Sequence, residues 1–163
     1  MMKQISKQIL TMLALVLPLL AGASGPVPAQ SIVTEIVTNP LTGIAMDGMD
    51  PVSYFTEAEP LPGSSDYEYR WKGVPWHFAS AANMEVFKRA PDIYAPQYGG
   101  HCGMSMARGF ISDGDPHIYA VFKDRLFLFY SAGNREAFLL AQDEAGLKGA
   151  ANWQTLSKSL STQ

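Results

Sequence analysis

The sequence predicts an α+β fold: a small single domain with two β-hairpins and packed helices. Its 163 residues match the length of one domain rather than two. All 18 aromatic residues lie between Tyr54 and Trp153, so we expect the hydrophobic core in that stretch. Within it, two pairs of strand-like segments are each joined by a two-residue loop and followed by a serine that can cap a helix.

The composition excludes several classes of protein. With 47% hydrophobic residues, the chain can bury enough apolar surface to offset the entropy of ordering, which excludes a disordered protein. Its one cysteine cannot form an intrachain disulfide, and it cannot build a four-cysteine zinc site or an iron–sulfur cluster. The formal net charge is −3 and no basic block occurs, so we expect no nucleic-acid partner.

Residues 1–29 have the pattern of a secretory signal peptide. Lys3 and Lys7 precede a twelve-residue apolar run, and small residues follow, so we expect cleavage after Ala23 or Ala29. The run is shorter than the ~20 residues that span a bilayer, which argues against a permanent membrane anchor. We therefore expect the mature protein to be periplasmic or secreted, with a formal charge of 10 − 15 = −5.

After the signal peptide, residues 30–43 are expected to form an extended lead-in and residues 44–160 the folded domain. We find no internal repeat in the sequence. The first hairpin is predicted around Lys72-Gly73, because apolar and charged residues alternate on both sides of this loop. The loop length predicts a register that pairs Trp71 with Val74, Tyr69 with Trp76, His77 with Glu68, and Tyr67 with Phe78.

Helices are predicted after each hairpin. Ser80 can cap a helix over residues 81–90, which Pro91 stops. The second hairpin is expected at residues 118–122 and 125–130, and its nearly continuous apolar residues indicate strands covered on both faces. Ser131 can then cap a helix that runs to about residue 145 and is closed by Gly146, and a terminal helix is expected over residues 150–160.

The single cysteine is the first candidate for chemistry. If a helix begins just after Gly99-Gly100, Cys102 lies near its N-terminus, where the helix dipole favours a thiolate. Met106 then lies one turn further on the same side, and His101 and Met104 add an imidazole and a second thioether. Such soft donors suit Cu(I). Three interpretations stay open: inert core packing, a metal site, and a redox or nucleophilic thiol.

The histidines and carboxylates give weaker signals. His77 is expected to pair with Glu68 across the first hairpin, and His117 to start a strand at the surface. The segments around Asp47 and Asp50, and around Asp113 and Asp115, have turn composition, and we expect the latter two side chains to be solvated. We expect no catalytic residue among them, and the sequence has no phosphate-binding glycine loop and no nucleophile elbow.

Several short motifs in the first half of the domain resemble the YHS domain. They are the segments Asp50 to Phe55, Tyr69 to Gly73, Trp76 to Ser80, and Phe87 with Pro91 to Tyr94. The resemblance runs from about Gly43 to Tyr94, and the continuation to Trp153 looks like the stand-alone secreted subgroup of that family. YHS domains are also fused to heavy-metal-transporting ATPases and to some oxygenases, so the resemblance implies metal handling.

This chain departs from the metal-linked members at three positions. Those members resemble D-P-V-C and F-C-S with a further cysteine four residues on, whereas this sequence has Ser53, Ala79 and Asn83 there. None of the three can replace a thiolate ligand. The sequence thus leaves two main hypotheses, besides a thiol-based redox function of Cys102 as a third. One is an exported copper-binding protein that uses Cys102, Met106, His101 and Met104. The other is a non-catalytic interaction or ligand-binding module in which Cys102 is structural.

Overall fold

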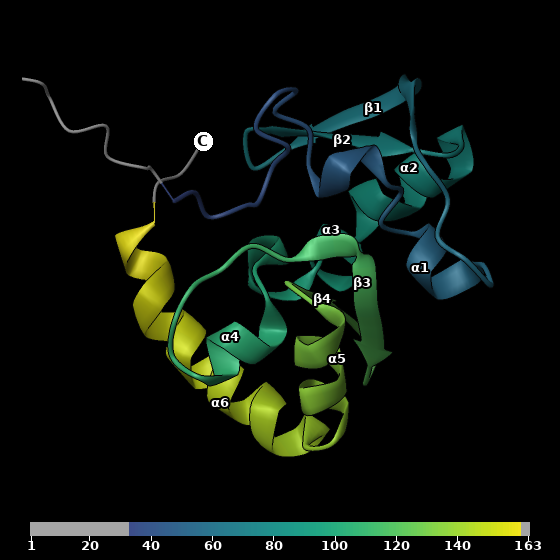
Figure 1. The fold of residues 1–163 in the computed structure, drawn as a ribbon. Coiled ribbons are helices and arrows are strands. Elements are labelled where there is room, and N and C mark those ends of the chain that lie inside the picture. Colours follow the sequence, from purple (N-terminus) through teal and green to yellow (C-terminus); the bar gives the residue numbers. More distant parts are fainter. Residues whose placement is uncertain (1–32, 161–163) are drawn as a thin grey trace, which may run out of the picture. The chain divides into compact units, whose positions relative to one another are not determined.

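Two β-hairpins, each followed by a helix, form the framework of the structure, a computed structural model that describes residues 33–160 (Figure 1). The predicted signal peptide lies outside the described residues. In chain order the elements are η1 (Met46–Gly48), α1 (Ser53–Thr56), β1 (Ser64–Trp71), β2 (Val74–Phe78), α2 (Ala81–Arg89), α3 (Pro91–Tyr94), η2 (Gln97–Gly100), α4 (Gly103–Ala107), β3 (Asp115–Phe122), β4 (Arg125–Phe129), α5 (Ala132–Leu139), α6 (Gln142–Leu156) and η3 (Ser157–Ser159). The predicted α+β class is confirmed.

The first hairpin has the predicted register near its loop and departs from it further away. Trp71 pairs with Val74, Tyr69 with Trp76 and Glu68 with His77, as predicted. The pairing of Tyr67 with Phe78 was wrong, because an irregularity in β1 brings Ser64 opposite Phe78 instead. At this irregularity the Ser64 hydroxyl accepts a hydrogen bond from the Asp66 N–H at 3.1 Å.

The second hairpin pairs β3 with β4 around Lys123-Asp124, where the sequence predicted the loop. Both loop residues have positive φ, at 50° and 55°, as a two-residue hairpin turn requires. β3 begins three residues earlier than predicted, at Asp115. Four of the five β4 residues are buried, but β3 leaves Val121 42% exposed, so the prediction of strands covered on both faces holds for β4 alone.

One phenylalanine from the following helix fills the centre of each hairpin. Phe87 of α2 lies 5.1 to 5.7 Å, centroid to centroid, from three rings of the first hairpin: Trp71, Trp76 and Phe78. Phe138 of α5 lies 4.9 to 6.4 Å from three rings of the second: Phe122, Phe127 and Phe129. Both helices begin at the predicted serine caps, whose hydroxyls accept hydrogen bonds from the Asn83 and Asn134 N–H groups.

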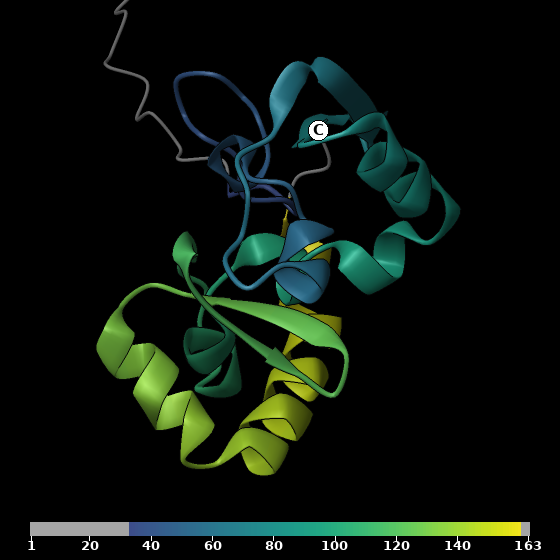
Figure 2. The same cartoon turned by 90° about the vertical axis from the view of Figure 1, so that its right-hand side faces the viewer.

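The boundary between the two C-terminal helices differs from the prediction. α5 ends at Leu139 and α6 runs unbroken through Gly146, whereas the sequence predicted one helix closed by that glycine. A glycine inside a helix costs only about 1 kcal/mol relative to alanine, so it does not have to end one. The break comes instead at Ala141, with φ −144° and ψ 43°, and it lets α6 turn Ala145 into the core. In Figure 2, α5 and α6 lie below the β3–β4 hairpin.

The two hairpin–helix units repeat the same local structure at an interval of 51 residues. β1 spans 64–71 and β3 spans 115–122, while β2 spans 74–78 and β4 spans 125–129. The strand irregularity recurs at the same place, since Asp115 lies opposite Phe129 as Ser64 lies opposite Phe78. Gly63 and Gly114 are also 51 residues apart, and a side chain at either would collide with the opposite strand.

This repeat corrects our reading of the sequence, in which we found none. Its sequence signature is the pattern F-x-S-A-x-N-x-E-x-F, which occurs at residues 78–87 and again at 129–138. The remaining positions differ enough between the copies that the pattern is hard to find without the structure. We call residues 46–89 unit 1 and residues 97–139 unit 2.

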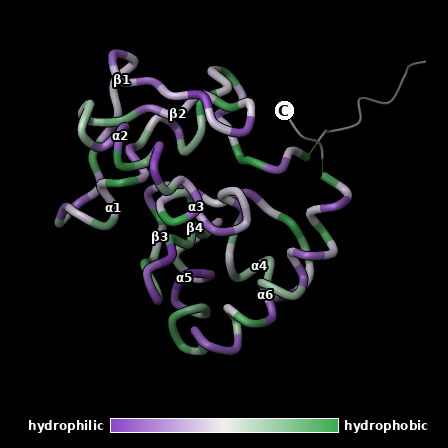
Figure 3. Tube along the Cα trace, turned by 180° about the vertical axis from the view of Figure 1, so that it is seen from behind, coloured by the Kyte–Doolittle hydropathy of each residue, from purple (hydrophilic) through white to green (hydrophobic). Residues whose placement is uncertain are grey.

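Hydrophobic and hydrophilic stretches alternate along the described chain (Figure 3). Among the described helices, none has the length and apolar character required to cross a membrane.

Candidate functional site

A buried aspartate holds unit 1 together. Asp50 is 0% exposed, and its carboxylate accepts three hydrogen bonds. Oδ1 accepts from the Val52 N–H at 2.8 Å, and Oδ2 accepts from the Ala79 N–H at 2.9 Å and from Asn83 Nδ2 at 2.6 Å. Hydrogen bonds to a charged acceptor offset the desolvation of burial. Asp50 thereby joins α1, the end of β2 and α2.

The three positions at which metal-linked YHS domains carry cysteines all contact this aspartate. The Ser53 hydroxyl donates to the Asp50 carbonyl oxygen at 2.7 Å, and the other two contacts are those of Ala79 and Asn83. The Ser53 oxygen also accepts from the Leu61 N–H at 2.9 Å. Where the resemblance implies a thiolate cluster, this chain has a hydrogen-bonded carboxylate.

Cys102 occupies the corresponding place in unit 2, 52 residues after Asp50 rather than 51, because η2 is one residue longer than η1. Its side chain is 0% exposed, and Asn134 Nδ2 lies 3.6 Å from Sγ. Burial raises the pKa of the thiol, but hydrogen bonds from Ser105 and from the Tyr130 and Met104 backbones outweigh it, so the pKa lies below its ordinary value. The position at the N-cap of α4 agrees with the prediction that a helix begins just after Gly99-Gly100.

The hydrogen-bond donors around Cys102 repeat those around Asp50. Tyr130 and Asn134 follow Ala79 and Asn83 by 51 residues, and each pair supplies one backbone N–H and one amide N–H. The backbone repeats as well, since the N–H of Asp50 donates to Leu61 O at 2.9 Å and that of Cys102 to Ser112 O at 2.8 Å. The thiol of unit 2 is thus enclosed by the donor set that binds a carboxylate in unit 1.

The other predicted ligands lie near Cys102 but do not converge on one position where a metal ion could bind. Met106 is 0% exposed and lies in the same hydrophobic cluster as Cys102, with Met104 packed against that cluster. His101 is 1% exposed, but its Nε2 lies 3.0 Å from Thr34 O, and its Nδ1 lies 3.2 Å from Asp113 Oδ1. Within the described residues, no group of three or more His, Cys, Asp or Glu side chains is placed to hold a metal ion.

His101 contacts the loop that precedes β3 through Asp113. No hydrogen bond of good geometry reaches its Nδ1 from the described residues, and Nδ1 lies 3.2 Å from Asp113 Oδ1, a contact that is an ion pair when the imidazole is protonated. The imidazole lowers the pKa of the Asp113 carboxyl, although partial burial opposes it. Asp113 and Asp115 are both exposed, as the sequence predicted, and the contact with His101 is an additional one that the sequence did not indicate. A neutral imidazole can donate to Thr34 or to Asp113 but not to both, whereas an imidazolium donates to both.

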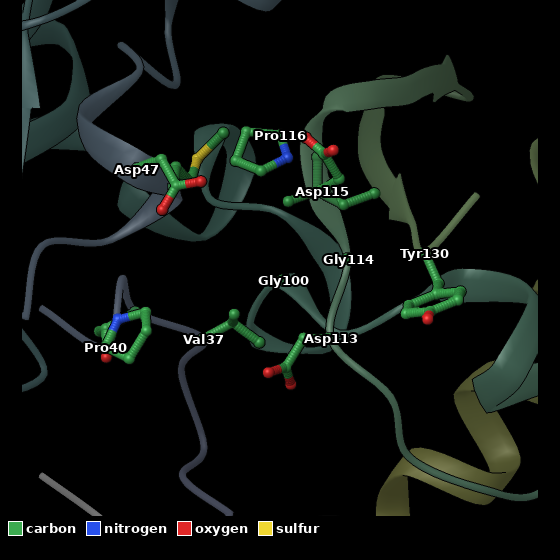
Figure 4. Close-up of a pocket in the computed structure, with 12 residues that line it drawn as sticks. Val37, Pro40, Asp47, Gly100, Asp113, Gly114, Asp115, Pro116 and Tyr130 are labelled. Carbon is green, nitrogen blue, oxygen red and sulfur yellow. The ribbon is translucent and has the colours of Figure 1, made fainter. Parts of the chain in front are cut away.

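Asp113 also lines an open cavity of about 340 Å³ (Figure 4). Its walls come from the lead-in, η1, the end of η2, the loop before β3 with the start of β3, and the end of β4. Three of the lining residues are aspartates, and none is lysine, arginine or histidine. The apolar part of the lining consists of Val37, Pro40, Met46, Pro116 and Leu128. We call this space the acidic cavity.

Each aspartate of the acidic cavity keeps one oxygen without a hydrogen bond to the described part of the chain. Asp47 Oδ1 accepts from Asn39, Asp115 Oδ1 accepts from the His117 N–H, and Asp113 Oδ1 faces His101. The sequence reading missed this site, because the three aspartates come from two turns that only the tertiary fold brings to one cavity.

Residues 46–98 thus form a small α+β module in which a hairpin and a short helix close around one buried aspartate. The YHS-domain family model matches residues 52–98, so this segment of the chain is similar to YHS domains. No curated protein matches the chain, and no solved structure does. The matched segment coincides with most of unit 1, while unit 2 lies almost entirely beyond it.

The Asp50 contacts predict that Asn83→Ala lowers the free energy of unfolding by about 1.5–3 kcal/mol, because a hydrogen bond to a buried charged group is lost. Urea unfolding followed by circular dichroism measures this change. Glu85→Gln is the matched control, since Glu85 is exposed on the same helix, and it should leave the unfolding midpoint nearly unchanged. An Asn83→Ala midpoint equal to that of the control would contradict the role assigned to Asn83.

The ion pair of His101 predicts a pH dependence. Because the pKa of Asp113 is lower in the folded state than its ordinary 3.8, the unfolded chain binds more protons between the two values. The stabilisation is complete above the ordinary pKa and is lost as the pH falls through the lowered one. In His101→Gln, the Asp113 pKa should rise towards its ordinary value, as measured by NMR titration of the carboxyl carbon. His117→Gln is the control and should leave the Asp113 titration unchanged.

Proposed function

We propose that this chain is an exported, non-catalytic binding module of two YHS-like units, in which Cys102 is structural and the acidic cavity binds a small organic polycation. Export is supported by the signal-peptide pattern of residues 1–29, and the proposed domain extends over residues 44–160. The observation that carries the binding function is the acidic cavity itself. It combines an apolar lining with three carboxylates that each retain an unpaired oxygen.

The spacing of the three carboxylates in the acidic cavity indicates which class of ligand fits it. Among the described residues they do not form a group that could hold one metal ion, yet all three line one cavity. A linear diamine or polyamine matches this arrangement, because its charges are spaced along an apolar chain. Its methylene groups would lie on the apolar lining while its ammonium groups contact the carboxylates.

This proposal predicts that spermidine binds the protein and that binding weakens several-fold when salt rises from about 50 to 300 mM. Isothermal titration calorimetry measures both effects. The double substitution Asp47→Asn with Asp115→Asn should weaken binding by roughly tenfold, as expected for about 1.4 kcal/mol of lost attraction. Asp66→Asn is the matched control, since Asp66 is exposed and does not line the cavity. Equal weakening by the control, or no binding by the parent protein, would refute the proposal.

The structural role of Cys102 rests on its correspondence with Asp50. The donor set that binds the Asp50 carboxylate in unit 1 should, in unit 2, accept an anion at position 102. An apolar side chain at position 102 would leave several N–H groups of that donor set without a partner. Cys102→Val should therefore lower the free energy of unfolding by about 1–3 kcal/mol, and Cys102→Asp should be the more stable variant at neutral pH. Urea unfolding of the two variants tests this order, and the reverse order would show that the donor set does not select an anion.

Copper binding is the second candidate function. It is favoured by the lowered pKa of the Cys102 thiol and by the neighbouring Met106 thioether in the same cluster. Coordination would require Cu(I) to displace the hydrogen bond from Asn134. Titration with Cu(I) in the presence of a competing chelator tests it. The candidate is supported if the parent protein binds Cu(I) more tightly than Cys102→Val, and it is excluded if the two bind equally.

A further inference from the structure

A second cavity is lined by all three tryptophans of the chain. It has a volume of about 330 Å³, and its aromatic residues are Trp71, Trp76, Tyr98 and Trp153. They come from both strands of the first hairpin, from η2 and from α6. Residues 82 positions apart thus contribute indole rings to one space, which we call the tryptophan cavity.

The indole rings are held in fixed positions. Trp76 is 1% exposed, and its Nε1 donates to the Trp71 carbonyl oxygen at 3.3 Å. Trp153 lies 5.9 Å from Tyr98 and 6.0 Å from His101, centroid to centroid. Trp71 and Trp153 are only half-buried, so a part of each ring remains accessible in the cavity. The cavity therefore offers rigid, flat apolar surfaces to a ligand.

Polar groups without partners accompany these surfaces. The side chains of Asp92, Gln97 and Gln154 line the cavity, and none of them makes a hydrogen bond within the described residues. The two remaining charged residues neutralise each other, because Lys72 Nζ lies 2.9 Å from Glu35 Oε1. One carboxylate and two primary amides thus remain available for hydrogen bonds to a ligand.

We infer that the tryptophan cavity binds a saccharide of one or two neutral pyranose rings. A pyranose ring has a flat face of C–H groups that stacks on an indole, and its edge carries hydroxyls that match amide and carboxylate partners. Small-molecule sites combine apolar walls and a few placed polar groups in the same way. A quaternary ammonium ligand fits less well, because the Lys72 ammonium already lies over the Trp71 ring, 5.0 Å from its centre, and takes the cation–π position on that ring.

Intrinsic fluorescence gives a direct test, since every tryptophan of the protein lines this cavity. The protein is titrated with cellobiose, maltose and diacetylchitobiose, and with choline as a cationic probe. We expect a saturable change in tryptophan emission with at least one saccharide and none with choline. The proposal is overturned if no saccharide produces a saturable change, or if choline produces the change instead.

Paired variants on α6 distinguish specific binding from a general effect. Gln154 is exposed and lines the cavity, so Gln154→Ala should keep the fold and weaken saccharide binding by roughly threefold or more, as the loss of one hydrogen bond predicts. Gln142→Ala is the matched control, because Gln142 belongs to the same helix but not to the cavity. Equal affinity of the two variants overturns the proposal. The outcome is independent of the acidic cavity, to which neither glutamine belongs.

Discussion

The structure depends on a repeated contact in which a buried acceptor is enclosed by N–H donors from the end of a hairpin and the start of a helix. In unit 1 the acceptor is the Asp50 carboxylate, held by Ala79 and Asn83. The contact fixes the helix against the hairpin, and Phe87 then closes the aromatic core between them. Burial of the carboxylate would be costly without these donors, so the loss of either the acceptor or its N–H donors would destabilise the fold.

The same contact explains why the chain keeps one cysteine. In unit 2 the Cys102 thiol receives donors equivalent to those that surround Asp50, so the position favours a hydrogen-bond acceptor. The repeat also accounts for Ser105, which lies three residues after Cys102 as Ser53 lies three residues after Asp50. Its hydroxyl accepts from Ser112 as the Ser53 hydroxyl accepts from the Leu61 N–H. A resemblance limited to unit 1 cannot reveal this, because Cys102 lies outside the segment that it covers.

Local patterns in the sequence were sufficient to predict the hairpins, their loops and the serine caps, because each depends on neighbouring residues. Features that depend on tertiary packing were not predictable in this way. Gly146 looks like a helix stop, yet α6 continues through it because Ala145 and Gly149 pack into the core. The partnership of His101 with Asp113 joins residues of two different loops, and nothing in the spacing of either residue indicates it.

The lead-in segment shows why both proposed sites depend on residues outside the matched family segment. Glu35 and Ile36 line the tryptophan cavity, whereas Val37 and Thr38 line the acidic cavity, so four consecutive residues contribute to both sites. The segment is held by a hydrogen bond from the Val37 N–H to Gly99 O at 2.8 Å, and a side chain at position 99 would collide with the Glu35 backbone. His101 adds a contact to Thr34 from the core side. Because these anchors belong to unit 2, the second unit positions the lead-in residues that line both cavities.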